Sequence, residues 1–105
     1  MKRFEVWITD LDPTKGAEMK KVRPCIIVSP DAMNNTLQTV IAAPLTSSQK
    51  GYPMRVQTSF QGISGEIVLD QVRCIDKSRL IKRVGKIAAN ETKAICKILC
   101  MMFKE

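Results

Sequence analysis

The segment PCIIVSP, residues 24–30, constrains the fold most, because it is apolar at almost every position and has a proline at each end. Successive side chains of a strand point to opposite faces of a sheet, so a strand without polar alternation is covered on both sides. The flanking prolines limit how far such a strand extends. The segment therefore predicts a central strand, within a chain whose length predicts one domain spanning residues 1–105.

The other segments predict short strands joined by turns. Residues 3–11 alternate apolar and polar side chains, which is typical of a half-buried strand. A long polar loop is expected at 12–22 and a turn or a single helical turn after Pro30. Further strands are expected at 38–48, 54–59, 65–76 (the longest) and 84–88, with a helical turn at 77–83. Within the first of these, Pro44 is expected to mark a sheet edge or a bulge.

The last sixteen residues change from strand to helix periodicity. Asn90 is a suitable N-cap, and Ile95, Ile98, Leu99 and Met102 recur at helical spacing. Many short strands followed by one helix predict a mainly-β fold with α: a small, strongly bent antiparallel β-barrel with a C-terminal helix packed on it.

The charge balance favours an anionic partner. Seventeen Lys and Arg against ten Asp and Glu give a net charge of +7, which suits nucleic acid or an acidic protein, although a basic surface can also serve solubility alone. The four cysteines lack zinc-site spacing, no apolar run is long enough to span a membrane, and the N-terminus does not resemble a signal peptide. We therefore expect a cytoplasmic protein that does not associate with membranes.

The chain contains no histidine, which removes His-based triads and ribonuclease chemistry built on two histidines. It also lacks a Walker loop and a GxGxxG motif. We expect neither a cofactor nor a bound metal, so any catalysis would depend on carboxylate, guanidinium and hydroxyl groups.

Arg23 is the first candidate for such chemistry. Pro24 biases it toward extended backbone at the start of a stiff strand, and a planar, permanently charged guanidinium suits a phosphate. The alternative is a structural ion pair between Arg23 and Glu18 or Asp70.

Asp70 and Thr46 are the other two candidates. Strand alternation across 66–75 would place Asp70 on a mostly apolar face, where a carboxylate must be paired or must shift its pKa. That environment indicates a functional carboxylate or a buried hydrogen bond that ties a loop to the barrel. Thr46 ends a strand in a Thr-Ser-Ser run, which is able to hold a phosphate but is also ordinary loop composition.

Three segments, in this order, resemble the MazF/PemK family of toxin–antitoxin ribonucleases: DLDPTKGAEMKKVRPCIIVSP, APLTSSQKGYP and DQVRCIDKSRL. The resemblance implies an SH3-like (CcdB/PemK-type) barrel and a homodimer that cleaves single-stranded RNA, often mRNA, at specific sequences without a metal. It implies 2′,3′-cyclic phosphate and 5′-hydroxyl ends. It also implies inhibition by an acidic, MazE/PemI-like antitoxin whose tail covers the RNA site.

The family's motif positions correspond to Arg23, Thr46, Glu18 and Asp70. Without histidine, our hypothesis is that Arg23 stabilises the phosphorane and is the candidate proton donor, that Thr46 holds a phosphoryl oxygen, and that Glu18 or Asp70 is the base. A loop histidine present in some relatives is missing here. Expected RNA contacts are Lys15, Lys20, Lys21, Lys50, Tyr52, Gln71 and Arg73. Two rival functions are a CcdB-like topoisomerase inhibitor without catalysis and an inactive relative that binds RNA or antitoxin.

Overall fold

The computed structural model describes residues 1–11 and 22–105. Its strands are β1 (Glu5–Asp10), β2 (Val22–Ile27), β3 (Thr39–Thr46), β4 (Arg55–Phe60), β5 (Ile63–Val68), β6 (Arg73–Asp76) and β7 (Leu80–Lys86). The helices are the short α1 (Asp31–Asn34) and the C-terminal α2 (Ala89–Phe103), and 3₁₀ turns occur at Leu69–Gln71 and Lys77–Arg79. The strands pair antiparallel in the order β4-β5-β3-β2-β1-β7, and β6 also pairs with β3.

The PCIIVSP segment forms most of a central strand, as its composition predicts. Strand β2 lies between β1 and β3, and its side chains enter two separate apolar cores. Ile26 and Val28, which directly follows β2, belong to the first core, whereas Cys25 and Ile27 belong to the second. All four are at most 4% exposed, and burial of such a side chain stabilises the fold by roughly 1.5–3 kcal/mol.

Strand β3 organises the sheet, because it has different neighbours along its length. On one side it pairs with β2; on the other it pairs with β6 through Thr39–Ala42 and with β5 through Leu45 and Thr46. Pro44 is therefore not on an edge strand. It falls between the β6 and β5 pairings, at a point where a residue without an N–H is tolerated.

The expected long strand at 65–76 is wrong, because three extra residues interrupt it. Leu45 pairs with Ile67, so an unbroken register would bring residue 70 opposite Ala42, but Arg73 is paired there instead. The excess forms the 3₁₀ turn Leu69–Gln71 between β5 and β6. The last strand also begins earlier than expected, at Leu80, directly after the 3₁₀ turn at Lys77–Arg79.

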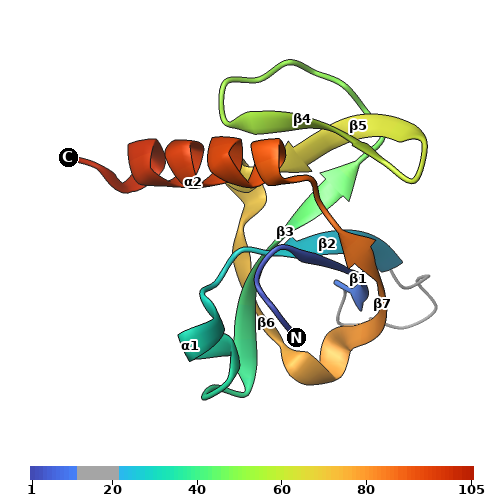
Figure 1. Cartoon of the computed structure of the whole chain (residues 1–105), viewed down its shortest axis with the longest axis vertical. Helices are drawn as coiled ribbons and strands as arrows, with labels where there is room; N and C mark the ends of the chain where they lie inside the picture. Colours follow the sequence, from blue (N-terminus) through green and yellow to red (C-terminus); the bar gives the residue numbers. More distant parts are fainter. Residues whose placement is uncertain (12–21) are drawn as a thin grey trace, which may run out of the picture.

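Helix α2 covers the first core. In Figure 1 it lies across the β4–β5 part of the sheet, with its C-terminal end extending past it. Ile95 is fully buried, and Ile98, Leu99 and Met102 pack against the same core, which confirms the helical period. The N-cap prediction is wrong, because the helix begins after Ala88, whose carbonyl accepts the N–H groups of Glu91 and Thr92.

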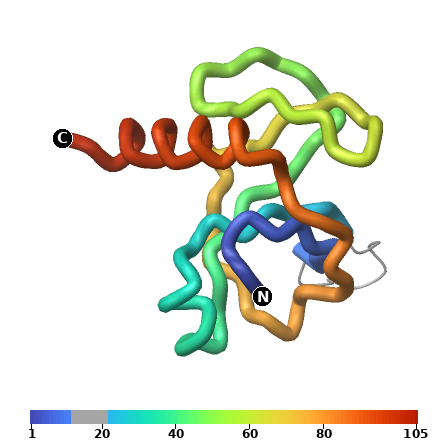
Figure 2. The backbone as a smooth tube through the Cα atoms, viewed as in Figure 1, coloured from blue at the N-terminus to red at the C-terminus, as the bar shows by residue number. Residues whose placement is uncertain are grey.

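The two ends of the sheet approach each other. Gln61, next to β4, donates its Nε2 hydrogen to the carbonyl of Val84 in β7 at 3.1 Å. A Cβ at Gly85 would lie 3.1 Å from the Phe60 ring, and its φ of +153° also favours glycine. Figure 2 shows the green-to-yellow β4–β5 hairpin beside the orange β7 segment. The predicted fold class is confirmed: mainly β, a small SH3-like antiparallel barrel with a C-terminal helix.

Candidate functional site

Arg23 and Thr46 line the same hollows of the barrel surface. Arg23 is exposed near the start of β2, where Thr9 of β1 is its Cα partner, and Thr46 is the last residue of β3. Strands β2 and β3 are neighbours, which is why residues 23 apart in the chain meet. Both side chains contribute to two adjoining cavities. The structure therefore brings together the two residues that the sequence singles out on separate grounds.

The first hollow, which we call the cationic cavity, has a volume of about 320 Å³. Three arginines line it, and among the described residues no carboxylate does. Guanidinium groups bind phosphate through charge-assisted hydrogen bonds. The described residues that line it are Leu11, Arg23, Pro44, Thr46, Arg55, Val68, Gln71 and Arg73.

The second hollow, the apolar cavity, has about the same volume of 320 Å³ and shares Arg23 and Thr46 with the first. Most of the other residues that line it are apolar and come from six strands, among them Ile8, Leu45, Phe60 and Val84. The Arg23–Thr46 pair therefore lies between a charged hollow and an apolar one, an arrangement that suits a ligand with both a phosphate and a ring.

Thr46 is positioned by its neighbours on both sides. Its Oγ1 accepts the N–H of Ser48 at 3.2 Å, and no acceptor for its own hydroxyl proton occurs among the described residues, which leaves that proton free to donate. Gly65 of β5 packs against its backbone: a Cβ at Gly65 would clash with the Thr46 carbonyl oxygen at under 3.0 Å. The absence of a side chain at Gly65 thus permits the close β3–β5 approach that positions Thr46.

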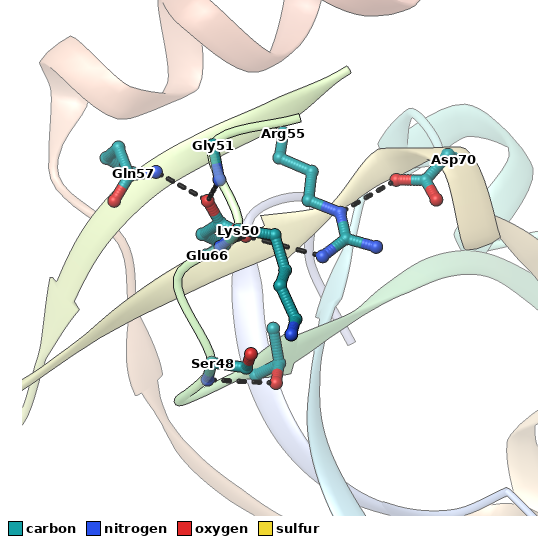
Figure 3. Close-up of polar contacts among 8 residues, drawn as sticks. Ser48, Lys50, Gly51, Arg55, Gln57, Glu66 and Asp70 are labelled. Atoms are coloured by element: carbon teal, nitrogen blue, oxygen red, sulfur yellow. Dashed lines mark hydrogen bonds and ion pairs between the residues drawn. The ribbon is translucent and has the colours of Figure 1, made fainter. Parts of the chain in front are cut away.

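Glu66 is a functional-site neighbour that the sequence interpretation missed. Its side chain is fully buried and accepts hydrogen bonds from Gly51 N at 2.8 Å, Lys50 N at 3.1 Å and Gln57 Nε2 at 2.6 Å (Figure 3). These donors, with the Gly51 N–H contributing most, hold its pKa below the ordinary value although burial acts in the opposite direction. An ionised Glu66 therefore ties the loop between β3 and β4 to the sheet.

Arg55 is the second residue that was missed. Its Nη1 pairs with Glu66 Oε1 at 3.4 Å and its Nε with Asp70 Oδ1 at 3.2 Å, both drawn in Figure 3. The guanidinium also lies over the Tyr52 ring, 4.6 Å from its centroid. The polar alternation of Arg55, Gln57 and Ser59 along β4 was the available signal. It did not reveal which carboxylates those side chains face.

Asp70 differs from its prediction. It is exposed on the 3₁₀ turn rather than enclosed on a strand face, and Leu69 takes the buried position beside it. The inserted turn is the physical reason, since it removes the strand alternation on which the prediction rested. The alternative pairing of Arg23 with Asp70 is also wrong, because the partner of Asp70 is Arg55.

The expected RNA contacts divide into three groups. Gln71 and Arg73 line the cationic cavity. Lys50 and Tyr52 are exposed on the loop that Glu66 holds, beside Arg55. Four predicted site residues lie outside the described part of the chain: Lys15, Glu18, Lys20 and Lys21.

Neither a metal site nor a membrane span is found in the part of the chain that the structure describes. Over these residues, no three His, Cys, Asp or Glu side chains are grouped so that they could hold a metal ion. Both helices within residues 1–11 and 22–105 are too short or too polar to cross a bilayer.

The fold and the cavities define a small basic β-barrel protein with a guanidinium-lined hollow at the ends of its central strands. Residues 2–103 match the family model described as PemK-like, MazF-like toxin of type II toxin-antitoxin system. The chain belongs to this family, and the match covers nearly all of its length.

Individual relatives agree in sequence and in structure. The chain is 36% identical over 91 residues to the endoribonuclease toxin MazF of Escherichia coli strain K12. The aligned region covers 86% of this chain and 81% of the relative. The chain is 33% identical over 101 residues to endoribonuclease MazF9 of Mycobacterium tuberculosis, covering 87% and 86% respectively. A MazE–MazF crystal structure from Deinococcus radiodurans matches with a TM-score of 0.85 and 27% identity, covering 97% of this chain and 94% of that one.

Proposed function

We propose that this chain, as a single toxin domain over residues 1–105, is a sequence-specific endoribonuclease that cleaves single-stranded RNA, with mRNA as the expected target. The observation that carries the proposal is the Arg23–Thr46 pair on the wall of a cavity lined by three guanidinium groups. Its relatives' names, endoribonuclease MazF and endoribonuclease PemK, support the same activity.

The proposed reaction is a transesterification that needs no metal. The 2′-hydroxyl loses its proton to the base, Glu18 or Asp70, and attacks the neighbouring phosphorus. The bond from phosphorus to the 5′-oxygen breaks, and that oxygen takes up a proton, for which Arg23 is the candidate donor. The products are a 2′,3′-cyclic phosphate and a 5′-hydroxyl. Arg23 stabilises the charge that develops on the pentacovalent phosphorus, and the free hydroxyl proton of Thr46 bonds one phosphoryl oxygen.

The requirement for a 2′-hydroxyl explains why RNA rather than DNA is cleaved. Bases move away from the scissile phosphate most easily in a single strand. The cationic cavity would then hold the phosphate and the adjoining apolar cavity an unstacked base. Gln71, Arg73, Lys50 and Tyr52, all at or beside the cationic cavity, are the proposed contacts to the rest of the strand, together with Lys15, Lys20 and Lys21.

The proposed protein partners are an antitoxin and a second copy of the chain. The matching Deinococcus radiodurans structure is a MazE–MazF complex, and a net charge of +7 complements an acidic tail. We propose that a MazE/PemI-like antitoxin covers the cationic cavity and so competes with RNA. A homodimer with two-fold symmetry is the expected assembly.

Cleavage of a long single-stranded RNA by three proteins tests the proposal: wild type, Arg23→Ala and Thr46→Ala, each shown to be folded by its melting curve. Wild type is expected to cut at defined sites, and each variant to lose on the order of 10²–10³ in rate, as when a group that stabilises the transition state is removed. Wild-type rates in both variants would refute the assigned roles. Absence of cutting by folded wild type would instead favour a topoisomerase inhibitor or an inactive relative.

A further inference from the structure

Arg55 lines the cationic cavity, yet the proposed reaction gives it no role. It lies on β4, whereas Arg23 lies on β2, so the two guanidinium groups reach the cavity from different strands. Arg23 and Thr46 line both hollows, but Arg55 lines the cationic one alone. Arg55 therefore approaches a bound strand on the side away from the apolar cavity.

The Arg55 side chain is held rigidly from the protein side. Its Nε pairs with Asp70 Oδ1 at 3.2 Å and its Nη1 with Glu66 Oε1 at 3.4 Å. The Tyr52 ring lies against the face of the guanidinium, with its centroid 4.6 Å from Cζ. The side chain is only 11% exposed. Among the described residues, no hydrogen bond involves its second terminal nitrogen, Nη2. A guanidinium held in this way has one edge left to donate and loses little conformational freedom when it binds an anion.

Glu66 fixes Arg55 and the neighbouring loop at the same time. A fully buried carboxylate is too costly to keep without partners, and here two loop N–H groups, Gln57 and Arg55 all donate to it. Neither Glu66 nor Asp70 is among the residues that line the cavity. The cavity wall therefore presents the guanidinium, whereas both carboxylates contact it from elsewhere.

We propose that Arg55 binds an RNA phosphate that flanks the scissile one, and that Glu66 is the positioning residue that holds Arg55 for this contact. The inference rests on the proposed ribonuclease function and adds a second phosphate site to it. Because Arg55 pairs with Asp70, one of the two candidate bases, binding of an uncleavable RNA tests the phosphate contact separately from the cleavage step.

The test is RNA binding as a function of salt, because each phosphate contact on a single strand contributes about 0.7 to the slope of log Kd against log salt concentration. The probe is a cleavage-site oligoribonucleotide made uncleavable by one 2′-deoxy substitution. Arg55→Gln removes the charge while retaining the same three side-chain carbons and a polar end, and Arg55→Lys restores the charge. Arg83→Ala is the matched control, since Arg83 also pairs with a carboxylate through Nε, at 2.8 Å to Glu5, but lines neither cavity.

Arg55→Gln is expected to lower the slope by about 0.7, to weaken binding and to raise KM for cleavage by more than it lowers kcat. Arg55→Lys should restore the slope, and Arg83→Ala should leave it unchanged. Glu66→Gln should weaken RNA binding, but in the Arg55→Gln background it should add little, because positioning an absent guanidinium has no effect.

If folded Arg55→Gln had the salt slope and the KM of wild type, this inference would be wrong. Cleavage by wild type in the same experiment would still support the ribonuclease function. An equal fall in the slope with Arg83→Ala would also overturn it, since the effect would then reflect net charge alone. If folded wild type neither cut nor bound RNA, the proposed function itself would fail, and this inference with it. If Arg55→Gln does not fold, the KM of Arg55→Lys provides the test. Lysine keeps the charge but lacks the planar guanidinium that Asp70 and Glu66 hold, so KM for cleavage should still rise, and an unchanged KM would overturn the inference.

Discussion

Arg23 and Asp70 show how differently single residues respond to their surroundings. Arg23 is positioned locally, because Pro24 and the following strand determine its backbone, and its side chain is exposed at the barrel surface. Asp70 depends on a register that residues far away in the chain impose. Its carboxylate meets Arg55 because β4 pairs with β5, where Arg55 is the Cα partner of Val68, and because the 3₁₀ turn follows directly after Val68.

The identity of the base is a residue-scale prediction with two outcomes. Glu18→Gln and Asp70→Asn each remove one candidate carboxylate with little change in shape. Loss of a general base lowers kcat by about 10²–10⁴ and removes the acid limb of the pH–rate profile. We expect one variant to show this pattern and the other to retain the acid limb. Steady-state kinetics from pH 4 to 9 provide the measurement, and a retained acid limb in both variants would exclude a carboxylate base of either kind.

Cys25 predicts how stability changes at alkaline pH. Burial raises the pKa of its thiol to about 11 from an ordinary value of 9.0, although Thr9, Arg73 and Arg23 favour the thiolate. The unfolded chain therefore loses this proton first. The stabilisation is fully present below pH 9 and is lost between pH 9 and about 11, amounting to roughly 2–3 kcal/mol.

Urea unfolding of wild type and Cys25→Ala at pH 8, 9, 10 and 11 measures this effect. The variant is expected to be less stable at pH 8, because it leaves a small cavity. Its stability should fall less steeply above pH 9, so the difference between the two proteins should shrink toward pH 11. Parallel curves for the two proteins would contradict the assignment, since other alkaline titrations are common to both.

At the scale of the elements, the sequence predicts what depends on local periodicity and misses what depends on register. The PCIIVSP strand and helix α2 follow from apolar patterns within one segment. The break in 65–76 does not, because the three extra residues become visible only against β3. Arg55 and Glu66 were missed for a similar reason: they come together through the β4–β5 pairing, in which Gln57 is the Cα partner of Glu66.

Gly65→Ala tests whether the β3–β5 packing positions Thr46. The added Cβ would clash with the Thr46 carbonyl oxygen, so the two strands must move apart and carry Thr46 with them. A displacement of about 1 Å at a catalytic group is sufficient to reduce the rate roughly a hundredfold. Single-turnover cleavage is expected to fall by about that factor.

Gly62→Ala is the matched control for this prediction. It places a side chain at a φ of +77° with no atom within 4 Å, which costs roughly 1–2 kcal/mol of backbone strain without displacing Thr46. It should lower the melting temperature and leave the cleavage rate near that of wild type. Equal rates for the two glycine variants would show that the close packing at Gly65 has no bearing on catalysis.

At the scale of the whole molecule, the curled sheet explains why one surface serves the chemistry. Strands β2, β3 and β4 each bring a site residue to the cationic cavity. The two apolar cores, the first of them covered by α2, stabilise the fold. A net charge of +7 attracts a polyanion to the molecule, and the guanidinium-lined cavity provides the place where its phosphates bind. The same surface suits an acidic antitoxin, so toxin activity and its inhibition would depend on one set of arginines.

The most direct test of the proposed metal-independent transesterification is cleavage, in EDTA, of two RNAs that differ by one oxygen atom. One carries ribose throughout; the other has a single 2′-deoxy nucleotide on the 5′ side of the scissile phosphate. The account predicts that the first RNA is cut to 2′,3′-cyclic phosphate and 5′-hydroxyl ends, and that the second is bound but not cut at that bond. Cleavage of the deoxy-substituted bond, 5′-phosphate ends or a requirement for added metal would contradict it.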